Sequence, residues 1–172
     1  MNFESMLSEG KINSLGRTIE VVDIVLKDQA KFEELYQCYF SDDEWVRLRV
    51  SNAMKRVHEE HPEWFDEYID KFLTEISKID QPSTKWTFAT LMLWHRKRLS
   101  DRQLQTAKDI IKRNLTKDDD WIVQNNSMEA LHTFSKNDEA LKKWLIPELT
   151  KRAKDERKSV ARRAQKYFDD LS

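Results

Sequence analysis

The chain has 172 residues and a net charge of −1, with 35% charged residues, two glycines and three prolines. So few glycines and prolines exclude a fold that needs many tight turns, and no stretch approaches the ~18 consecutive apolar residues of a membrane span. This length and composition, with six tryptophans as large apolar anchors, predict one soluble and mainly helical domain.

The first forty residues indicate a reducing, cytoplasmic environment. The segment 1–10 includes Glu4 and Glu9 and lacks the basic region that opens a secretory signal. Cys38 is the only cysteine, so it cannot form an intramolecular disulfide, and it lies in an apolar run where a buried, unreactive thiol is expected. We therefore expect a cytoplasmic protein without a membrane partner.

Apolar residues recur at helical spacing along the chain, and start signals divide them into nine helices. Ser41 with Glu44 and Ser100 with Gln103 have the spacing of capping boxes, and Pro62 suits the first turn of a helix. Further starts are expected at Ser83, Asp118 and Asn137, and the predicted helices cover 14–27, 30–40, 42–60, 63–78, 84–98, 101–115, 119–135, 138–153 and 156–171.

The sequence repeats with a period of 38 residues, since Asp-Glu-Trp-Val at 43–46 is similar to Asp-Asp-Trp-Ile at 119–122, two periods later. A period of this size is typical of stacked helix pairs. The apolar residues of the third 38-residue unit fit the pattern better when they are shifted by one position. Three columns one period apart are mostly apolar: Val46, Thr84, Ile122 and Val160; Met54, Met92, Ala130 and Phe168; Leu35, Leu73, Ile111 and Leu149. The shifted apolar stripe of the third unit is Val123, Ser127, Ala130 and Phe134.

Three segments resemble the HEAT and armadillo-like repeat family. They are the acidic turn followed by Val-Arg at 43–47, a looser version at 155–162, and the proline-containing segment 144–149. The resemblance implies an all-α fold, a right-handed α-solenoid of about four antiparallel helix pairs preceded by an N-terminal helix. We therefore expect a single domain over 1–172. Its parts would be N-terminal capping helices at about 1–28 and repeats at 30–60, 63–98, 101–135 and 138–171.

In such stacks, one face of each second helix lines the concave side and stays free for contact. Aromatic, amide and guanidinium groups predominate on that predicted face, and they are common in binding hot spots. The alternative is that Trp45 and Trp121 pack between adjacent repeats. The predicted binding residues are Trp45, Arg49, Asn52, Arg56, Trp94, Trp121, Asn125, His132 and Arg163, and the same face includes Ser83, Thr87, Thr90, Met128, Ser159 and Lys166.

The sequence contains no grouping that favours catalysis. His58 and His61 are three residues apart, whereas the zinc-protease helix needs histidines four apart with glutamate directly after the first. The acidic runs 42–44 and 118–120 are better explained as helix N-terminal residues than as cation ligands. We predict no catalytic residue, no cofactor and no metal, which disfavours an enzyme.

The sequence favours a non-enzymatic scaffold that binds another protein or peptide segment. The alternative is nucleic-acid binding by the C-terminal half, because residues 81–172 hold 20 Lys and Arg against 13 Asp and Glu. In this alternative the chain resembles, at the level of fold only, the bacterial alkylpurine DNA glycosylases, which hold a duplex in a basic groove. Residues 1–80 hold 10 basic against 18 acidic residues and would repel DNA.

Overall fold

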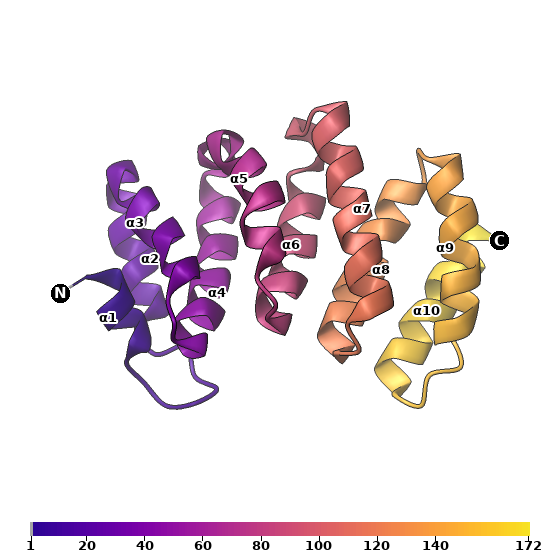
Figure 1. Ribbon diagram of the computed structural model, residues 1–172, viewed down its shortest axis with the longest axis horizontal. Helices are drawn as coiled ribbons and strands as arrows, with labels where there is room; N and C mark the ends of the chain where they lie inside the picture. The colour runs from indigo at the N-terminus through magenta and orange to yellow at the C-terminus, as the bar shows by residue number, and fades with distance from the viewer. Residues whose placement is uncertain (1) are drawn as a thin grey trace. The chain divides into compact units, whose positions relative to one another are not determined.

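A computed structural model describes residues 2–172 (Figure 1), and within them every regular element is helical and no β-strand occurs. The all-α prediction is confirmed. No helix of this part of the chain combines the length and the apolar content needed to cross a membrane. The α-helices are α1 (Phe3–Ser8), α2 (Thr18–Lys27), α3 (Phe32–Gln37), α4 (Glu44–Glu60), α5 (Ile69–Thr74), α6 (Pro82–Trp94), α7 (Asp101–Lys117), α8 (Trp121–Ser135), α9 (Glu139–Arg152) and α10 (Lys158–Leu171).

The chain divides into two compact units, Met1–Thr87 and Phe88–Ser172, and the division falls inside α6. The first unit holds 11 Lys and Arg against 18 Asp and Glu, a net charge of −7. The second holds 19 against 13, a net charge of +6. A single domain over 1–172 stays a prediction.

One of the two predicted capping boxes is confirmed and the other is wrong. At α7, the Gln103 amide donates to Ser100 Oγ at 3.1 Å and the Ser100 amide donates to Gln103 Oε1 at 2.9 Å. At α4 the N-cap is Asp43, whose carboxylate accepts from the Trp45 amide at 2.8 Å. Ser41 cannot cap α4 because its hydroxyl accepts from the Asp43 amide before the helix begins.

The predicted first helices 30–40 and 63–78 are helical but not continuous α-helices. Short 3₁₀ turns at Gln29–Lys31 and Cys38–Phe40 flank α3. A 3₁₀ segment of 7 residues, Pro62–Tyr68, precedes α5, and a short turn at Ile76–Lys78 follows it. Such turns are frequent at α-helix ends, and Pro62 opens its segment as predicted. The starts expected at Asp118 and Asn137 lie one or two residues too early, since the caps are Asp120 and Asp138. Boundary shifts of this size are ordinary.

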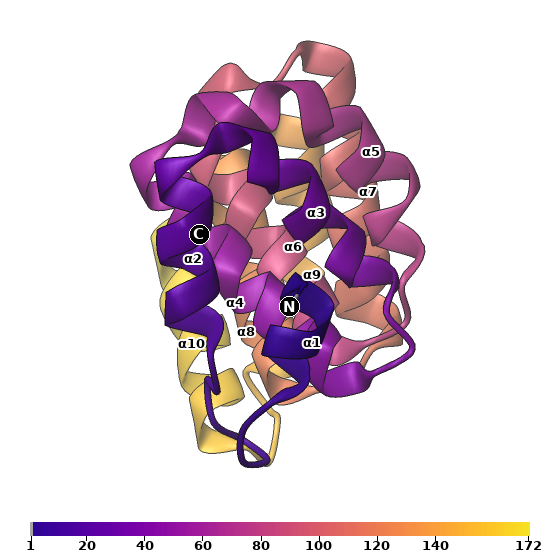
Figure 2. The ribbon, with the colours of Figure 1, turned by 90° about the vertical axis from the view of Figure 1, so that its left-hand side faces the viewer.

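In the first unit, an aromatic cluster joins residues about one period apart. The helices α3 and α5 that it links both lie towards the right of the view in Figure 2. The ring centroids of Phe32 and Tyr68 are 4.7 Å apart, those of Phe32 and Phe65 5.0 Å, and those of Tyr36 and Phe72 5.8 Å. All three pairs meet edge to face, the arrangement that aromatic rings favour. The layer of α3 is thereby packed against the layer of α5, as a 38-residue repeat requires.

In the second unit, α8 and α10 are joined in the same way. Asn125 Nδ2 donates to Ser159 Oγ at 3.4 Å, and the His132 ring stacks on Tyr167 with centroids 4.5 Å apart. His132 Nε2 lies 2.7 Å from Asp170 Oδ2. These partners are separated by 34 to 38 residues. The shifted stripe of the third unit is confirmed, because its members Val123, Ser127, Ala130 and Phe134 are all buried.

Asp138 fixes the start of α9 to α7 and should make the second unit sensitive to acid. Its carboxylate accepts from Lys108 Nζ at 2.8 Å and from the Leu141 amide at 3.0 Å, and the Lys108 ammonium in particular lowers the Asp138 pKa. A lowered pKa in the folded state stabilises the fold above the unfolded value of about 4, and this contribution is lost as the pH falls through the folded-state pKa.

We therefore expect Asp138→Asn to destabilise the protein by roughly 1 kcal/mol at pH 7. The deficit should shrink below about pH 4. Thermal unfolding at several pH values measures it, with the exposed Asp109→Asn as control. A deficit that is unchanged at pH 3 would show that the charge of Asp138 is not its source.

Candidate binding surface

Three of the four residues predicted on α4 keep access to solvent. Arg56 is exposed, Trp45 and Asn52 are half-buried, and Arg56 Nε donates to Asn52 Oδ1 at 2.8 Å. Arg49 is different, since it is only 2% exposed. The prediction that Arg49 belongs to a binding surface is wrong for that reason.

Arg49 instead holds the connection between α1 and α2. Its guanidinium donates to the carbonyl oxygens of Leu7 at 2.8 Å, Glu9 at 3.0 Å, Lys11 at 3.0 Å and Ser14 at 3.1 Å. Five fixed N–H groups in one plane suit several carbonyls at once, which a lysine cannot match. Arg49 therefore orders a segment that has little apolar content to order itself.

Two glycines allow this connection to close around the guanidinium. Gly16 has φ +52° and Gly10 has φ +117°, both in the region that favours glycine. A Cβ on Gly16 would overlap the Glu9 carbonyl oxygen and approach Arg49 Cζ to 3.3 Å. The two glycines of the chain are thus explained by one close approach of backbone to a buried arginine.

On α8, the free stripe is displaced by one residue from the predicted one. Trp121, in the first turn, is 50% exposed, but Asn125 is 3% exposed and Met128 is fully buried. The prediction that Asn125 contributes to the surface is therefore wrong. The residues that reach solvent along α8 are Ile122, Asn126, Glu129, His132 and Thr133.

The sequence contained the signal for this displacement. The apolar stripe that includes Val123 is one residue out of the strict 38-residue register. If the whole predicted face of α8 is shifted by one residue in the same way, Asn126 takes the position of Asn125 and Glu129 that of Met128. Both missed residues retain access to solvent, since Asn126 is half-buried and Glu129 is exposed.

His132 and Arg163 lie where α8 meets α10, and each contacts a carboxylate. Arg163 Nη1 lies 3.8 Å from Glu129 Oε2, and His132 contacts Asp170 as described above. The hydrogen bond from His132 lowers the pKa of Asp170. Arg163 keeps 46% of its side-chain surface exposed and His132 keeps 12%. Arg163 is therefore the more accessible of the two.

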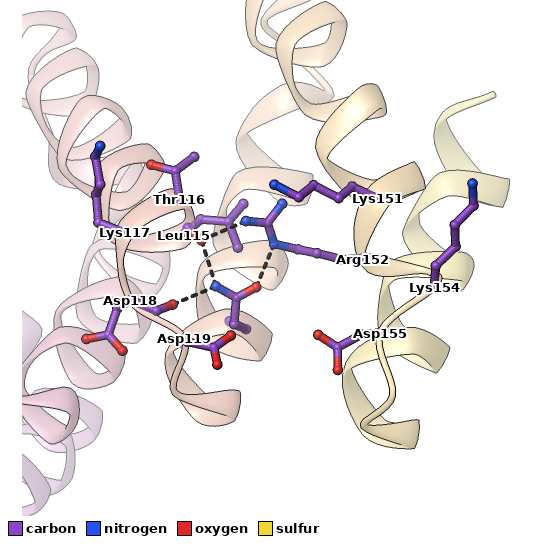
Figure 3. A pocket seen from close by; sticks show the side chains of 10 residues that line it. Leu115, Thr116, Lys117, Asp118, Asp119, Lys151, Arg152, Lys154 and Asp155 are labelled. Carbon is purple, nitrogen blue, oxygen red and sulfur yellow. Dashed lines mark hydrogen bonds between the residues drawn. The ribbon is translucent and has the colours of Figure 1, made fainter.

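A cavity of about 250 Å³ lies between the α7–α8 connection and the end of α9 (Figure 3). Gln124 Nε2 donates to the carbonyl oxygens of Leu115 at 2.6 Å and Asp118 at 2.7 Å. Arg152 Nε donates to Gln124 Oε1 at 2.6 Å, and Arg152 Nη2 donates to the Leu115 carbonyl at 2.7 Å. Gln124 and Arg152 are 5% and 8% exposed, so this buried network joins α8 and α9 to the end of α7.

The mouth of the same cavity mixes acids and bases. Two carboxylates of the lining, those of Asp119 and Asp155, pair with Arg157, whose guanidinium lowers the pKa of Asp155 to about 2. Side chains of Lys151 and Lys154 also line the opening (Figure 3). Because neither sign of charge predominates, the cavity is best explained as a joint between α7, α8 and α9.

The thiol of Cys38 is placed where it cannot react in the native state. Burial raises its pKa to about 12, with Glu4 and Glu34 adding to the effect, and the residue is 4% exposed. Because the thiolate is the nucleophile, we expect a disulfide reagent at pH 8 to label Cys38 only on unfolding. Rapid labelling of the folded protein would contradict this placement.

Among residues 2–172, no three His, Cys, Asp or Glu side chains gather in a way that could hold a metal ion. Of the nine predicted surface residues, Arg49 and Asn125 are buried and the other seven reach solvent. Comparisons with protein-family models, with curated proteins and with solved structures give no match.

Proposed function

We propose that this protein is a non-enzymatic scaffold that binds another protein through its second helices, α4, α6, α8 and α10. The proposal includes the right-handed solenoid of HEAT-like pairs that the resemblance to HEAT and armadillo-like repeats implies. Contacts between residues about one period apart support it in each unit. In the first unit they are the ring contacts of Phe32 with Tyr68, and in the second those of His132 with Tyr167.

The exposed tryptophans carry the proposal. Trp94 ends α6 and is 40% exposed, and Trp121 begins α8 and is 50% exposed. Tryptophan is among the residues most enriched in binding hot spots, because a partner can cover a large, rigid apolar surface at little cost in entropy. Both side chains lie in the second unit, where exposed arginines and lysines can surround an apolar contact with a polar rim.

Photo-cross-linking tests the proposal. A benzoylphenylalanine in place of Trp121 should capture a defined partner from the cells that make the protein. The same probe in place of Lys143 should capture none, because this exposed position lies on α9, the first helix of its predicted pair. With the captured partner purified, Trp121→Ala should weaken binding about tenfold or more, as expected of a hot spot. Lys143→Ala should leave the affinity unchanged. Equal capture from both positions would contradict the proposal.

A second candidate function is nucleic-acid binding by the second unit. The observation that favours it is the exposed basic face of α10, with Lys158, Arg162, Arg163 and Lys166 on a unit of net charge +6. Cations spaced along one helix can follow phosphates. For a duplex, the log–log slope of affinity against salt should be about −0.9 per phosphate neutralised. Absence of duplex binding at low salt would remove this candidate.

A further inference from the structure

A second cavity in the unit Phe88–Ser172 has a strongly basic wall. Its volume is about 420 Å³, and it is bounded by the turn after α6, by α7, and by the end of α8 with the connection that follows. None of its lining residues is a carboxylate. The lining consists of Arg96, Lys97, Leu104, Lys108, Thr133, Phe134, Lys136 and Asn137.

The four cations of this wall are only partly balanced. Lys108, 8% exposed, is neutralised by Asp138. Lys136 Nζ is 3.9 Å from Asp170, a carboxylate that His132 binds more closely, at 2.7 Å. The remaining two cations, Arg96 and Lys97, make no ion pair among the described residues.

The donors of Arg96 and Lys97 are largely uncommitted within the chain. Arg96 Nη1 donates to the Leu93 carbonyl at 2.8 Å, a contact that leaves the rest of its guanidinium available and its charge uncompensated. Both residues are exposed. The cavity thus has a surplus of about two positive charges, which matches the charge of about −1.5 to −2 of a phosphate monoester at pH 7.

The rest of the wall favours an organic group beside the anion. Phe134, 5% exposed, and Leu104, half-buried, lie in the same cavity as the cations. Thr133 and Asn137 add a hydroxyl and an amide that can donate to an oxygen. Small-molecule sites commonly combine apolar walls with a few such polar groups.

We propose that this basic cavity binds an organic phosphate monoester. Arg96, Lys97 and Lys136 hold the phosphate, with charge-assisted hydrogen bonds from guanidinium and ammonium groups. The organic group packs against Leu104 and Phe134. This site uses none of the tryptophans of the protein-binding face proposed above, although Thr133 of the cavity also lies on the exposed stripe of α8.

Titration of the full chain with phenyl phosphate, followed by calorimetry, tests the assignment. We expect saturable binding with one site, and weaker binding of inorganic phosphate, which cannot use the apolar wall. The double variant Lys97→Ala/Lys136→Ala should weaken phenyl phosphate roughly tenfold or more. The control Lys151→Ala/Lys154→Ala removes the same charge from the rim of the other cavity and should bind as the native chain does.

The pH dependence gives a second, independent readout. The second ionisation of a phosphate monoester lies near pH 6, so the affinity should rise between pH 5 and 7. Phenyl sulfate, which keeps one charge throughout, reports any change that comes from protein groups such as His95 and His132, which directly precede Arg96 and Thr133 of the lining in the chain. Asp138 and Asp170, whose pKa values are lowered, stay charged in this range.

Three results would overturn the proposal. They are no saturable binding of phenyl phosphate, an equal loss of affinity in the two double variants, and inorganic phosphate bound as tightly as phenyl phosphate. Thermal unfolding of each variant shows that a lost affinity does not come from a lost fold. Lys97 and Lys136 are exposed, so both variants are expected to fold.

Discussion

Replacing Arg49 by alanine is expected to lower the free energy of unfolding by about 3 kcal/mol. The variant leaves four backbone carbonyls of the α1–α2 connection without their common donor, among them those of Leu7 and Glu9. It also removes a large, fully buried side chain. Chemical denaturation measures the loss, and amide hydrogen exchange should show faster exchange across 9–17 than elsewhere.

Arg56→Ala on the same helix is the matched control. Arg56 is exposed and bonds only Asn52 among the described residues, so its loss should cost within about 0.5 kcal/mol. Arg49→Lys should recover only a small part of the stability, because an ammonium cannot reach four carbonyls in a plane. If Arg49→Ala and Arg56→Ala are equally stable, Arg49 does not hold the connection.

The second large effect is expected at Met128. Met128→Arg places a charge at a fully buried position of α8 and should cost about 4 kcal/mol or more. Glu129→Arg makes the neighbouring residue, which is exposed, basic as well. We expect it to cost within about 1 kcal/mol, from the lost pairing with Arg163.

The two variants separate the strict 38-residue register from the shifted one. In the strict register, Met128 corresponds to Asn52 and should tolerate arginine, whereas Glu129 should not. Thermal unfolding of both proteins decides between them. A stable Met128→Arg protein would contradict the placement of α8.

Much of the fold could be predicted from the sequence because its signals are local. Apolar spacing and start residues predict nine helical ranges, and each of them overlaps an α-helix, although α1 is not among them and α2 begins at Thr18 instead of residue 14. The spacing of Ser100 and Gln103 predicts the capping box that the structure shows. Boundaries differ where two capping residues compete, as at Ser41 and Asp43. Which hydroxyl or carboxylate caps a helix depends on the direction of the chain just before the helix. The spacing of residues does not show this direction.

The candidate surface was predicted less well because exposure depends on contacts distant in sequence. Arg49 occupies a position on the same helix stripe as Arg56, yet a connection some 40 residues earlier covers it. The periodicity of α4 does not indicate that Arg49 is buried. The only sequence signal is the pair Gly10 and Gly16, and their role is recognised only once the position of Arg49 is known. The burial of Asn125 could be predicted from the sequence, because the apolar stripe that includes Val123 is displaced by one residue.

Ring contacts between residues about one period apart test the layered arrangement most directly. Nuclear Overhauser spectra of the protein should show cross-peaks between Phe32 and Tyr68 and between His132 and Tyr167, whose ring centroids are 4.7 Å and 4.5 Å apart. Each of these ring contacts joins successive layers within one unit. The two residues of each contact lie in different predicted helix pairs. Absence of both cross-peaks, with aromatic contacts confined to sequence neighbours, would contradict the stacking of 38-residue layers.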